Sequence, residues 1–527
     1  MVSTDRPARR TRTLGLAAAA AAAVTAAAGL APAAGAAPST PGLGPLGTAT
    51  VHGDIYSTDT IPGVGPGAGA PVRSSIPGGT CSSVFVGSDG MPLALCTAYL
   101  GTDPLETTPP TVQLLDPDTA EVLTKIQLPK GALLGGVYGY LDDRDRVLIV
   151  DGEHRLHAIG HERGEGGAWE LTDEVVFDLS PLIGDGDFVT GLAPGTDGTV
   201  WFVTVDGIVG TVTEGQADSA QVLDLPRANG RPAPERVSNG ITVREGGASV
   251  MTSHALYEVA QGPDGALETV WLREYERGPA RHPGMLSHGS GSTPTYFGPG
   301  KDDYVAFLDS ADRSTLFVLD RASGEPVCTM DAFATTDHPG TAASDGVLID
   351  GPAQSENSPI ALPADDGRGW SIIMVNTYGF EYMPMAVDGD AVPAQAPYRG
   401  GMSAVTFDGA DCTRSWTNTT RTATLPKATT GDRLIHGLAY ADDPAAELGS
   451  AEVPGVAETL ATGWGQSAGP VYYSAIDADT GAEVVREKVG DGPVDEPMEL
   501  TGTIAPGAHG QGVYWQGTVG RMLRIGH

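Results

Sequence analysis

Positive charge is scarce in this chain. Its 527 residues include 31 lysines and arginines against 66 aspartates and glutamates, which gives a formal net charge of −35. A chain this acidic repels phosphate backbones and anionic membrane surfaces, so we expect no nucleic-acid partner. Apolar runs of spanning length are also missing after the N-terminal region, so we expect no membrane span in the mature chain.

Cysteines are few, and none are adjacent or in C-x-x-C spacing, which argues against a redox motif or a zinc site. An even number of cysteines in an exported chain predicts disulfides. Four cysteines allow three pairings. We favour Cys81–Cys96, across a hairpin, and Cys328–Cys412, between neighbouring repeats.

The N-terminal 37 residues have the layout of an export signal. A basic head is followed by the Ala-rich run 14–30 and by the small residues Ala34-Gly35-Ala36. We expect cleavage near Ala36/Ala37 and a secreted or cell-envelope protein, by either the general secretory or the twin-arginine route. Residues 38–74 are rich in Gly, Pro and Ala, which predicts a flexible arm with one extended segment at 48–56.

Long amphipathic helices are missing as well. The chain has 73 glycines and 40 prolines, and no segment after the signal keeps a 3.6-residue apolar period. Short β-rich strands recur instead, each followed by a polar turn. The first four turns, at Asp151, Asp206, His254 and Asp309, are 55, 48 and 55 residues apart.

One phrase occurs three times: an apolar strand, Asp, two residues, Thr or Ser, and a small residue. Its copies begin at Asp116, Asp320 and Asp477, and their separations of 204 and 157 residues are near multiples of about 51. The phrase is typical of a hairpin turn. We therefore predict an all-β fold over 75–527, a seven- or eight-bladed β-propeller of four-stranded antiparallel blades. Its closing strand is expected near 48–56 or 83–86.

The closing phrase 512–525 and the three Asp phrases resemble the repeat of quinoprotein-like propellers. Segments 195–203 and 238–241 are similar to NHL and SMP-30/gluconolactonase propellers. The segments 286–295 and 354–359 are similar to parts of exported bacterial propellers to which we attach no activity. These resemblances imply architecture more than chemistry. Quinoprotein dehydrogenases generally use adjacent cysteines, recurrent Trp and calcium, and the first two are missing here, which disfavours a quinone-type oxidoreductase.

The SMP-30 resemblance implies a divalent cation, such as Ca²⁺, held by oxygen ligands from separate blades. The candidate metal ligands are Asn239, Asp309, Glu356 and Asn376. His254 and His288 are the candidate proton carriers of a metal-dependent hydrolase or lactonase. The alternative for each Asn and Asp is a turn cap, and for His254 a structural hydrogen bond inside its blade.

Candidate ligand-binding residues lie where the repeat pattern breaks: Ser290, Thr293, Glu356, Asn357 and Tyr378. The alternatives are a structural Gly/Ser loop for 286–295 and a core position for Tyr378. The leading hypothesis is an exported, monomeric propeller that binds a small molecule or an extracellular protein without catalysis and without an assured cofactor. The metal-dependent hydrolase is the first alternative.

Overall fold

The computed structural model describes residues 40–100, 106–131, 138–339, 342–365, 367, 369–380, 388–422, 425–442, 469–492, 494–496 and 502–527. They belong to the unit Ser39–His527. The predicted signal, residues 1–37, lies outside the described residues. Within the described part, no helix is long and apolar enough to cross a membrane.

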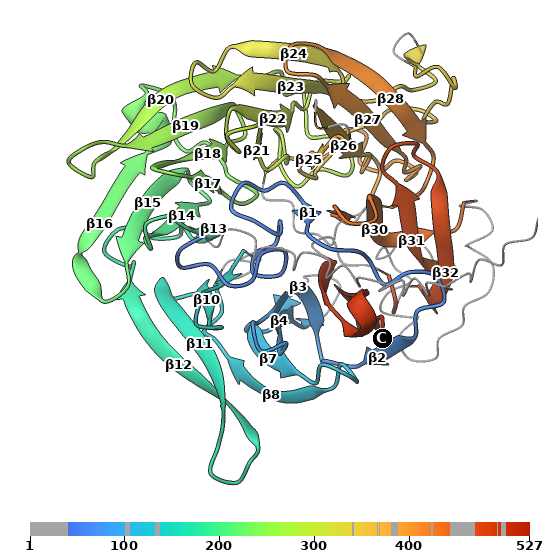
Figure 1. The fold of residues 1–527 in the computed structure, drawn as a ribbon. Coiled ribbons are helices and arrows are strands. Elements are labelled where there is room, and N and C mark those ends of the chain that lie inside the picture. The colour runs from blue at the N-terminus through green and yellow to red at the C-terminus, as the bar shows by residue number, and fades with distance from the viewer. Residues whose placement is uncertain are drawn as a thin grey trace, which may run out of the picture. The chain divides into compact units, whose positions relative to one another are not determined.

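Eight antiparallel four-stranded blades form a ring, which confirms the predicted propeller and fixes the blade number (Figure 1). Each blade is given from its innermost to its outermost strand. Blade 1 consists of β3 (Thr80–Val86), β4 (Pro92–Thr97), β7 (Thr111–Leu115) and β8 (Val122–Gln127), and blade 2 of β9 (Tyr140–Leu141), β10 (Val147–Val150), β11 (Arg155–Arg163) and β12 (Trp169–Asp178). Blade 3 consists of β13 (Val189–Pro194), β14 (Val200–Thr204), β15 (Ile208–Thr213) and β16 (Gln216–Asp224), and blade 4 of β17 (Thr242–Arg244), β18 (Gly247–Met251), β19 (Ala255–Gln261) and β20 (Leu267–Glu274).

The second half of the ring repeats the pattern and adds the N-terminal strands. Blade 5 consists of β21 (Thr295–Phe297), β22 (Tyr304–Leu308), β23 (Thr315–Asp320) and β24 (Pro326–Asp331), and blade 6 of β25 (Ile360–Pro363), β26 (Trp370–Val375), β27 (Met402–Phe407) and β28 (Cys412–Asn418). Blade 7 consists of β29 (Lys427–Thr429), β30 (Leu434–Tyr440), β31 (Pro470–Asp477) and β32 (Glu483–Asp491), and β1 (Thr60–Ile61) pairs with β29. Blade 8 consists of β33 (Thr503–Pro506), β34 (Gly512–Gly517), β35 (Met522–Ile525) and β2 (Val72–Ser75). Smaller elements are β5 (Tyr99–Leu100), β6 (Glu106–Thr107), the helix α1 (Leu225–Ala228) and the 3₁₀ turn η2 (Ala508–Gly510).

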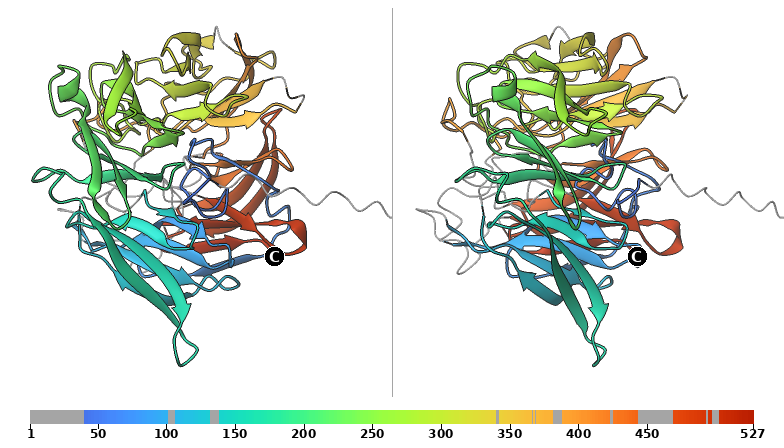
Figure 2. Two further views of the ribbon diagram at one scale, coloured as in Figure 1. Left: turned by 60° about the vertical axis from the view of Figure 1, so that its left-hand side comes forward. Right: turned by 90° about the vertical axis from the view of Figure 1, so that its left-hand side faces the viewer.

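Burial explains the apolar strand sequences. The second strand of blade 2, β10, reads Val-Leu-Ile-Val and is buried at every position, because neighbouring blades cover both of its faces. The outermost strand β8 alternates between partly buried and exposed residues, because a neighbouring blade covers only one of its faces. The hairpin of β11 and β12 is the longest in the ring and extends past its neighbours (Figure 2).

The repeated Asp phrase is the turn between the third and fourth strands of a blade. Asp116 Oδ1 accepts hydrogen bonds from Thr119 N (2.9 Å) and Thr119 Oγ1 (3.0 Å). Ser323 and Thr480 make the same bonds to Asp320 and Asp477. In blade 7 this turn also docks the preceding blade: the Trp416 indole on β28 donates to Ala478 O at 2.9 Å.

Residues 40–75 differ from the flexible arm predicted for 38–74. The chain from Leu43 to Ile61 runs through the centre of the ring (Figure 1), and the predicted extended segment 48–56 consists of turns and bends. The carbonyls of Ile55, Tyr56 and Thr58 accept hydrogen bonds from innermost strands of blades 4, 5 and 6, each at 2.9–3.0 Å. We call residues 43–61 the central segment.

The ring closes through β2, which pairs antiparallel with β35 in blade 8. Neither expected closing strand is used, since 83–86 belongs to β3 of blade 1 and 48–56 lies in the central segment. The composition of the N-terminal region misled the prediction because Gly, Ser and Asp here adopt left-handed turns, as at Gly53 (φ 82°) and Asp59 (φ 53°), rather than disorder.

Both predicted disulfides are confirmed. Cys81–Cys96 joins β3 to β4 within blade 1, and Cys328–Cys412 joins the outermost strands of blades 5 and 6. Two disulfide-bonded pairs fit a protein of an oxidising, extracellular compartment.

Candidate functional site

A buried ion pair fixes the central segment to blade 7. The Asp59 carboxylate is 0 % exposed and accepts hydrogen bonds from Lys427 Nζ and Ser358 Oγ, while His52 Nδ1 lies 3.1 Å from Asp59 Oδ1. Burial pushes the pKa of Asp59 up, but the charges of Lys427 and His52 outweigh it and hold that pKa below its usual value. We call these four residues the central anchor. They make the axis of the ring a packed structural region.

Two of the predicted metal ligands meet beside this region. Asn239 Nδ2 donates to Glu356 Oε1 at 2.9 Å, and the backbone N–H of Leu286 donates to Glu356 Oε2 at 3.1 Å. Tyr138 donates its hydroxyl to Asn239 Oδ1 at 2.8 Å. All four residues lie in connections that lead from one blade to the innermost strand of the next. We call Tyr138, Asn239, Leu286 and Glu356 the Glu356 cluster.

Glu356 is the chemically unusual member of this cluster. Burial raises its pKa to about 7, although Asn239, the Leu286 N–H and the charge of Arg281 act in the opposite direction. Gly291 makes room for the carboxyl group, because a Cβ at Gly291 would lie 2.0 Å from Glu356 Cδ. Such a carboxyl group can hold a proton at neutral pH.

The other two predicted metal ligands act as turn caps. Asp309 Oδ1 accepts the N–H of Thr315 at 2.7 Å. Asn376 Oδ1 accepts the N–H groups of Gln354 and Tyr378 at 3.1 and 3.0 Å, and its Nδ2 donates to Gly400 O. Within the described residues, no three His, Cys, Asp or Glu side chains are grouped to hold a metal ion. Calcium binding stays a prediction.

The two predicted proton carriers both have structural partners. His254 Nε2 faces the Arg277 guanidinium, and its Nδ1 lies 2.9 Å from Ser253 Oγ. Burial and the charge of Arg277 lower the pKa of His254. His288 Nε2 lies 3.0 Å from Gly278 O, to which it can donate. The structure therefore places these histidines in hydrogen-bonded positions, and their catalytic role stays a prediction.

The predicted ligand-binding residues are mostly buried. Ser290, Thr293 and Asn357 are buried, and Ser290 Oγ donates to Leu308 O. Tyr378 is half-buried, and burial raises its pKa. Their contact with a ligand stays a prediction.

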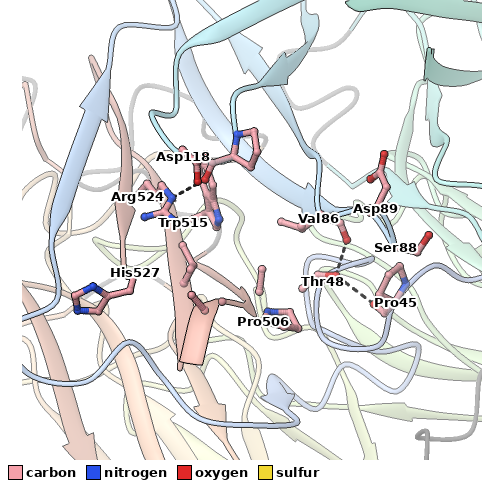
Figure 3. Close-up of a pocket in the computed structure, with 17 residues that line it drawn as sticks. Pro45, Thr48, Val86, Ser88, Asp89, Asp118, Pro506, Trp515, Arg524 and His527 are labelled. Atoms are coloured by element: carbon pink, nitrogen blue, oxygen red, sulfur yellow. Dashed lines mark hydrogen bonds between the residues drawn. The ribbon is translucent and has the colours of Figure 1, made fainter. Parts of the chain in front are cut away.

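A pocket of about 540 Å³ lies between blades 8 and 1, where the ring closes (Figure 3). Its wall combines apolar and charged side chains from both blades with two residues of the central segment. They are Pro45, Thr48, Val86, Gly87, Ser88, Asp89, Gly90, Pro117, Asp118, Ala505, Pro506, Gly507, Ala508, Val513, Trp515, Arg524 and His527. We call it the seam pocket.

Sequence reasoning missed the seam pocket. Trp515 and Arg524 belong to the closing phrase 512–525, whose resemblance to quinoprotein-like repeats implies architecture and no binding site. The pocket forms where Pro45 and Thr48 of the central segment meet the strands and turns of blades 8 and 1. The available signal was Arg524 within the apolar run 522–525, in a phrase that contains no acidic residue.

Comparison with known proteins defines the fold and little more. No protein-family profile matches the chain. An uncharacterised protein of Archaeoglobus fulgidus is 34% identical over 185 residues, which is 34% of each chain, so the match spans about a third of that relative. The quinohemoprotein alcohol dehydrogenases of Comamonas testosteroni and Pseudomonas putida HK5 each superpose with a TM-score of 0.50 and 12% identity, over 91% of this chain and 80% of theirs.

The fold similarity raises the question of a quinone cofactor, but the cysteines, tryptophans and central residues of this chain do not form a binding platform for one. The four cysteines form two separate disulfides within or between blades, and buried Val51 and Ile55 of the central segment fill the axis. The described Trp side chains lie on β12, β14, β20, β26, β28 and β34, none of which is an innermost strand. The chain is an eight-bladed β-propeller similar in fold to quinohemoprotein alcohol dehydrogenases.

Proposed function

We propose that this protein is an exported propeller that binds a small ligand in the seam pocket without catalysing a reaction on it. The observation that carries the proposal is the pocket itself. Its volume of about 540 Å³ falls within the roughly 300–1,000 Å³ typical of small-molecule sites. Apolar walls with a few convergent polar groups are the usual composition of such sites.

The packing of the axis supports this location. Propeller enzymes of the kinds considered above would place ligand and metal near the axis, where this chain has its central segment and central anchor. The seam pocket lies to one side, and among the described N-terminal residues Pro45 and Thr48 line it. Export is supported by the two disulfides.

A blocked pocket tests the proposal. Ala508 is exposed and lines the pocket, so Ala508→Trp should fill it without disturbing a blade, whereas Gln511→Trp adds the same side chain at an exposed position outside the lining. Ligand-detected NMR with a panel of neutral, cationic and anionic aromatic compounds should find saturable binding to the wild type and Q511W, and none to A508W. Binding that A508W leaves unchanged would refute the pocket as the ligand site.

A metal-dependent hydrolase is the second candidate, favoured by the contact between Asn239 and Glu356. It requires a cation at the Glu356 cluster. Thermal unfolding with calcium and with chelator tests it. This candidate predicts that calcium raises the wild-type Tm and has no effect on Glu356→Gln, and an equal Tm in calcium and chelator would remove its basis.

A further inference from the structure

Arg524 is a buried cation on the wall of the seam pocket. The residue lies on β35 and is 7 % exposed. Its Nε donates to Pro117 O and its Nη1 to Gly526 O, each at 2.6 Å. Both partners are neutral carbonyls. A guanidinium has five N–H donors, so these two bonds leave donors for a further partner.

Two shielded arginines elsewhere in the ring have a carboxylate partner, while the buried Arg414 donates to the backbone carbonyls of Asp331 and Ala332. Arg146 pairs with Asp142 at 2.8 Å, and Arg244 pairs with Glu258 at 2.6 Å. Among the described residues, no carboxylate lies within ion-pair distance of Arg524. Acids outnumber bases 66 to 31 in the sequence, so the missing partner does not reflect a shortage of acids. Burial lowers the pKa of Arg524, and the nearby charges of Asp118 and Asp116 offset this effect only in part.

The rest of the pocket wall suits an apolar body. Trp515 lies next to Arg524 in Figure 3, with the guanidinium carbon 5.9 Å from the indole centroid. Val513, Pro506 and Pro117 add further apolar surface. A flat or aliphatic group can pack there while a charged group reaches the guanidinium.

We infer that the seam pocket binds a small organic anion, with its charged group on the Arg524 guanidinium and its apolar body against Trp515. This inference rests on the proposed function, because it concerns the same pocket. A guanidinium binds carboxylate and phosphate oxygens through paired N–H donors, so the shared chemistry is an anionic oxygen group on an apolar body.

Asp118 provides a second test of the inference. It is exposed, lines the pocket and lies beside Arg524 in Figure 3. Its negative charge must oppose an anion bound at Arg524. Asp118→Asn should therefore tighten anion binding, by about twofold or more for an exposed charge. Glu165→Gln, in the turn between β11 and β12, removes the same charge from an exposed residue outside the pocket and is the matched control.

The experiment is a titration of the full mature protein with benzoate, phenyl phosphate and benzyl alcohol, followed by ligand-detected NMR. We expect benzoate or phenyl phosphate to bind at least about tenfold more tightly than benzyl alcohol, the difference that one charge-assisted hydrogen bond provides. The stronger of the two anions distinguishes a carboxylate from a phosphate ligand. Arg524→Gln should remove the preference, D118N should strengthen it, and E165Q should leave it unchanged.

The outcomes separate the inference from the proposed function. Equal binding of benzyl alcohol and both anions, still blocked by A508W, would overturn the anion inference and leave the pocket as a ligand site. Absence of saturable anion binding to the wild type would also overturn the inference. Because R524Q removes two hydrogen bonds, it can unfold the protein, and D118N then decides: weaker or unchanged anion binding in D118N contradicts the inference.

Discussion

At the scale of the residue, the contact of Glu356 with Asn239 fits the prediction of a shared site, whereas its packing against Gly291 was not predicted. The sequence placed it in a polar phrase between strands, and the structure brings it to Asn239, as a shared site requires. The phrase gave no sign that Gly291, from another blade connection, leaves space for its carboxyl group. That contact joins residues 65 positions apart, so only the folded chain reveals it.

The space at Gly291 predicts a specific intolerance. Gly291→Ala places a Cβ about 2 Å from the Glu356 carboxyl group, so the cluster must shift. We expect a loss of about 1–3 kcal/mol in the free energy of unfolding, typical of overpacking a well-packed site. Gly184→Ala is the control, because no heavy atom lies within 4 Å of its added Cβ. Equal stability of the two variants in denaturant titrations would show that the cluster is not packed as described.

The raised pKa of Glu356 predicts a pH-dependent stability. Its pKa is about 7 in the folded protein, against an ordinary value of 4.5, so the folded state binds more protons between these pH values. The stability from this group is complete below about pH 4.5 and is lost as pH rises through about 7. Between about pH 4.5 and pH 8, the wild type should lose on the order of 3 kcal/mol more than Glu356→Gln. Asp309, whose pKa is also raised to about 7, is present in both proteins and cancels. Parallel stability curves would contradict this prediction.

At the scale of elements, the central segment is the main surprise. Its Gly, Pro and Thr content is typical of a linker, yet its backbone carbonyls satisfy N–H groups of innermost strands in several blades. Such irregular backbone can lie inside a protein only when its polar groups are paired. The segment therefore acts as a structural core element of the ring.

The central anchor predicts how strongly this element is held. Lys427→Met removes the ammonium group that pairs with the buried Asp59 carboxylate, and breaking a buried ion pair typically costs about 3–5 kcal/mol. The double variant Asp59→Asn with Lys427→Met removes both charges, and Asn tolerates the left-handed φ of 53° at this position. Denaturant titrations should show the double variant to be more stable than K427M alone. A double variant as unstable as K427M would mean that the ion pair does not hold the segment.

At the scale of the whole molecule, the hairpin turns and the disulfides could be predicted from the sequence, and the way in which the ring closes could not. The Asp116, Asp320 and Asp477 turns are bonded within three residues, so their repeat revealed the propeller. The paired cysteines followed from their number and their places in the repeats. Ring closure depends on the pairing of β2 with β35, at opposite ends of the chain, and the central segment depends on contacts such as Ser57 with Thr242 and Asp59 with Lys427, which are 185 and 368 residues apart. No local pattern encodes such contacts, and the seam pocket depends on the same closure.

The central claim is that the ligand site lies at the seam between blades 8 and 1 and not on the axis. A crystallographic fragment screen of the mature protein tests it most directly. We predict that aromatic fragments gather in the seam pocket against Trp515 and Arg524, with residues 43–61 still in the centre of the ring. Fragments that gather instead at Glu356 and Asn239, with the seam pocket empty, would contradict the account.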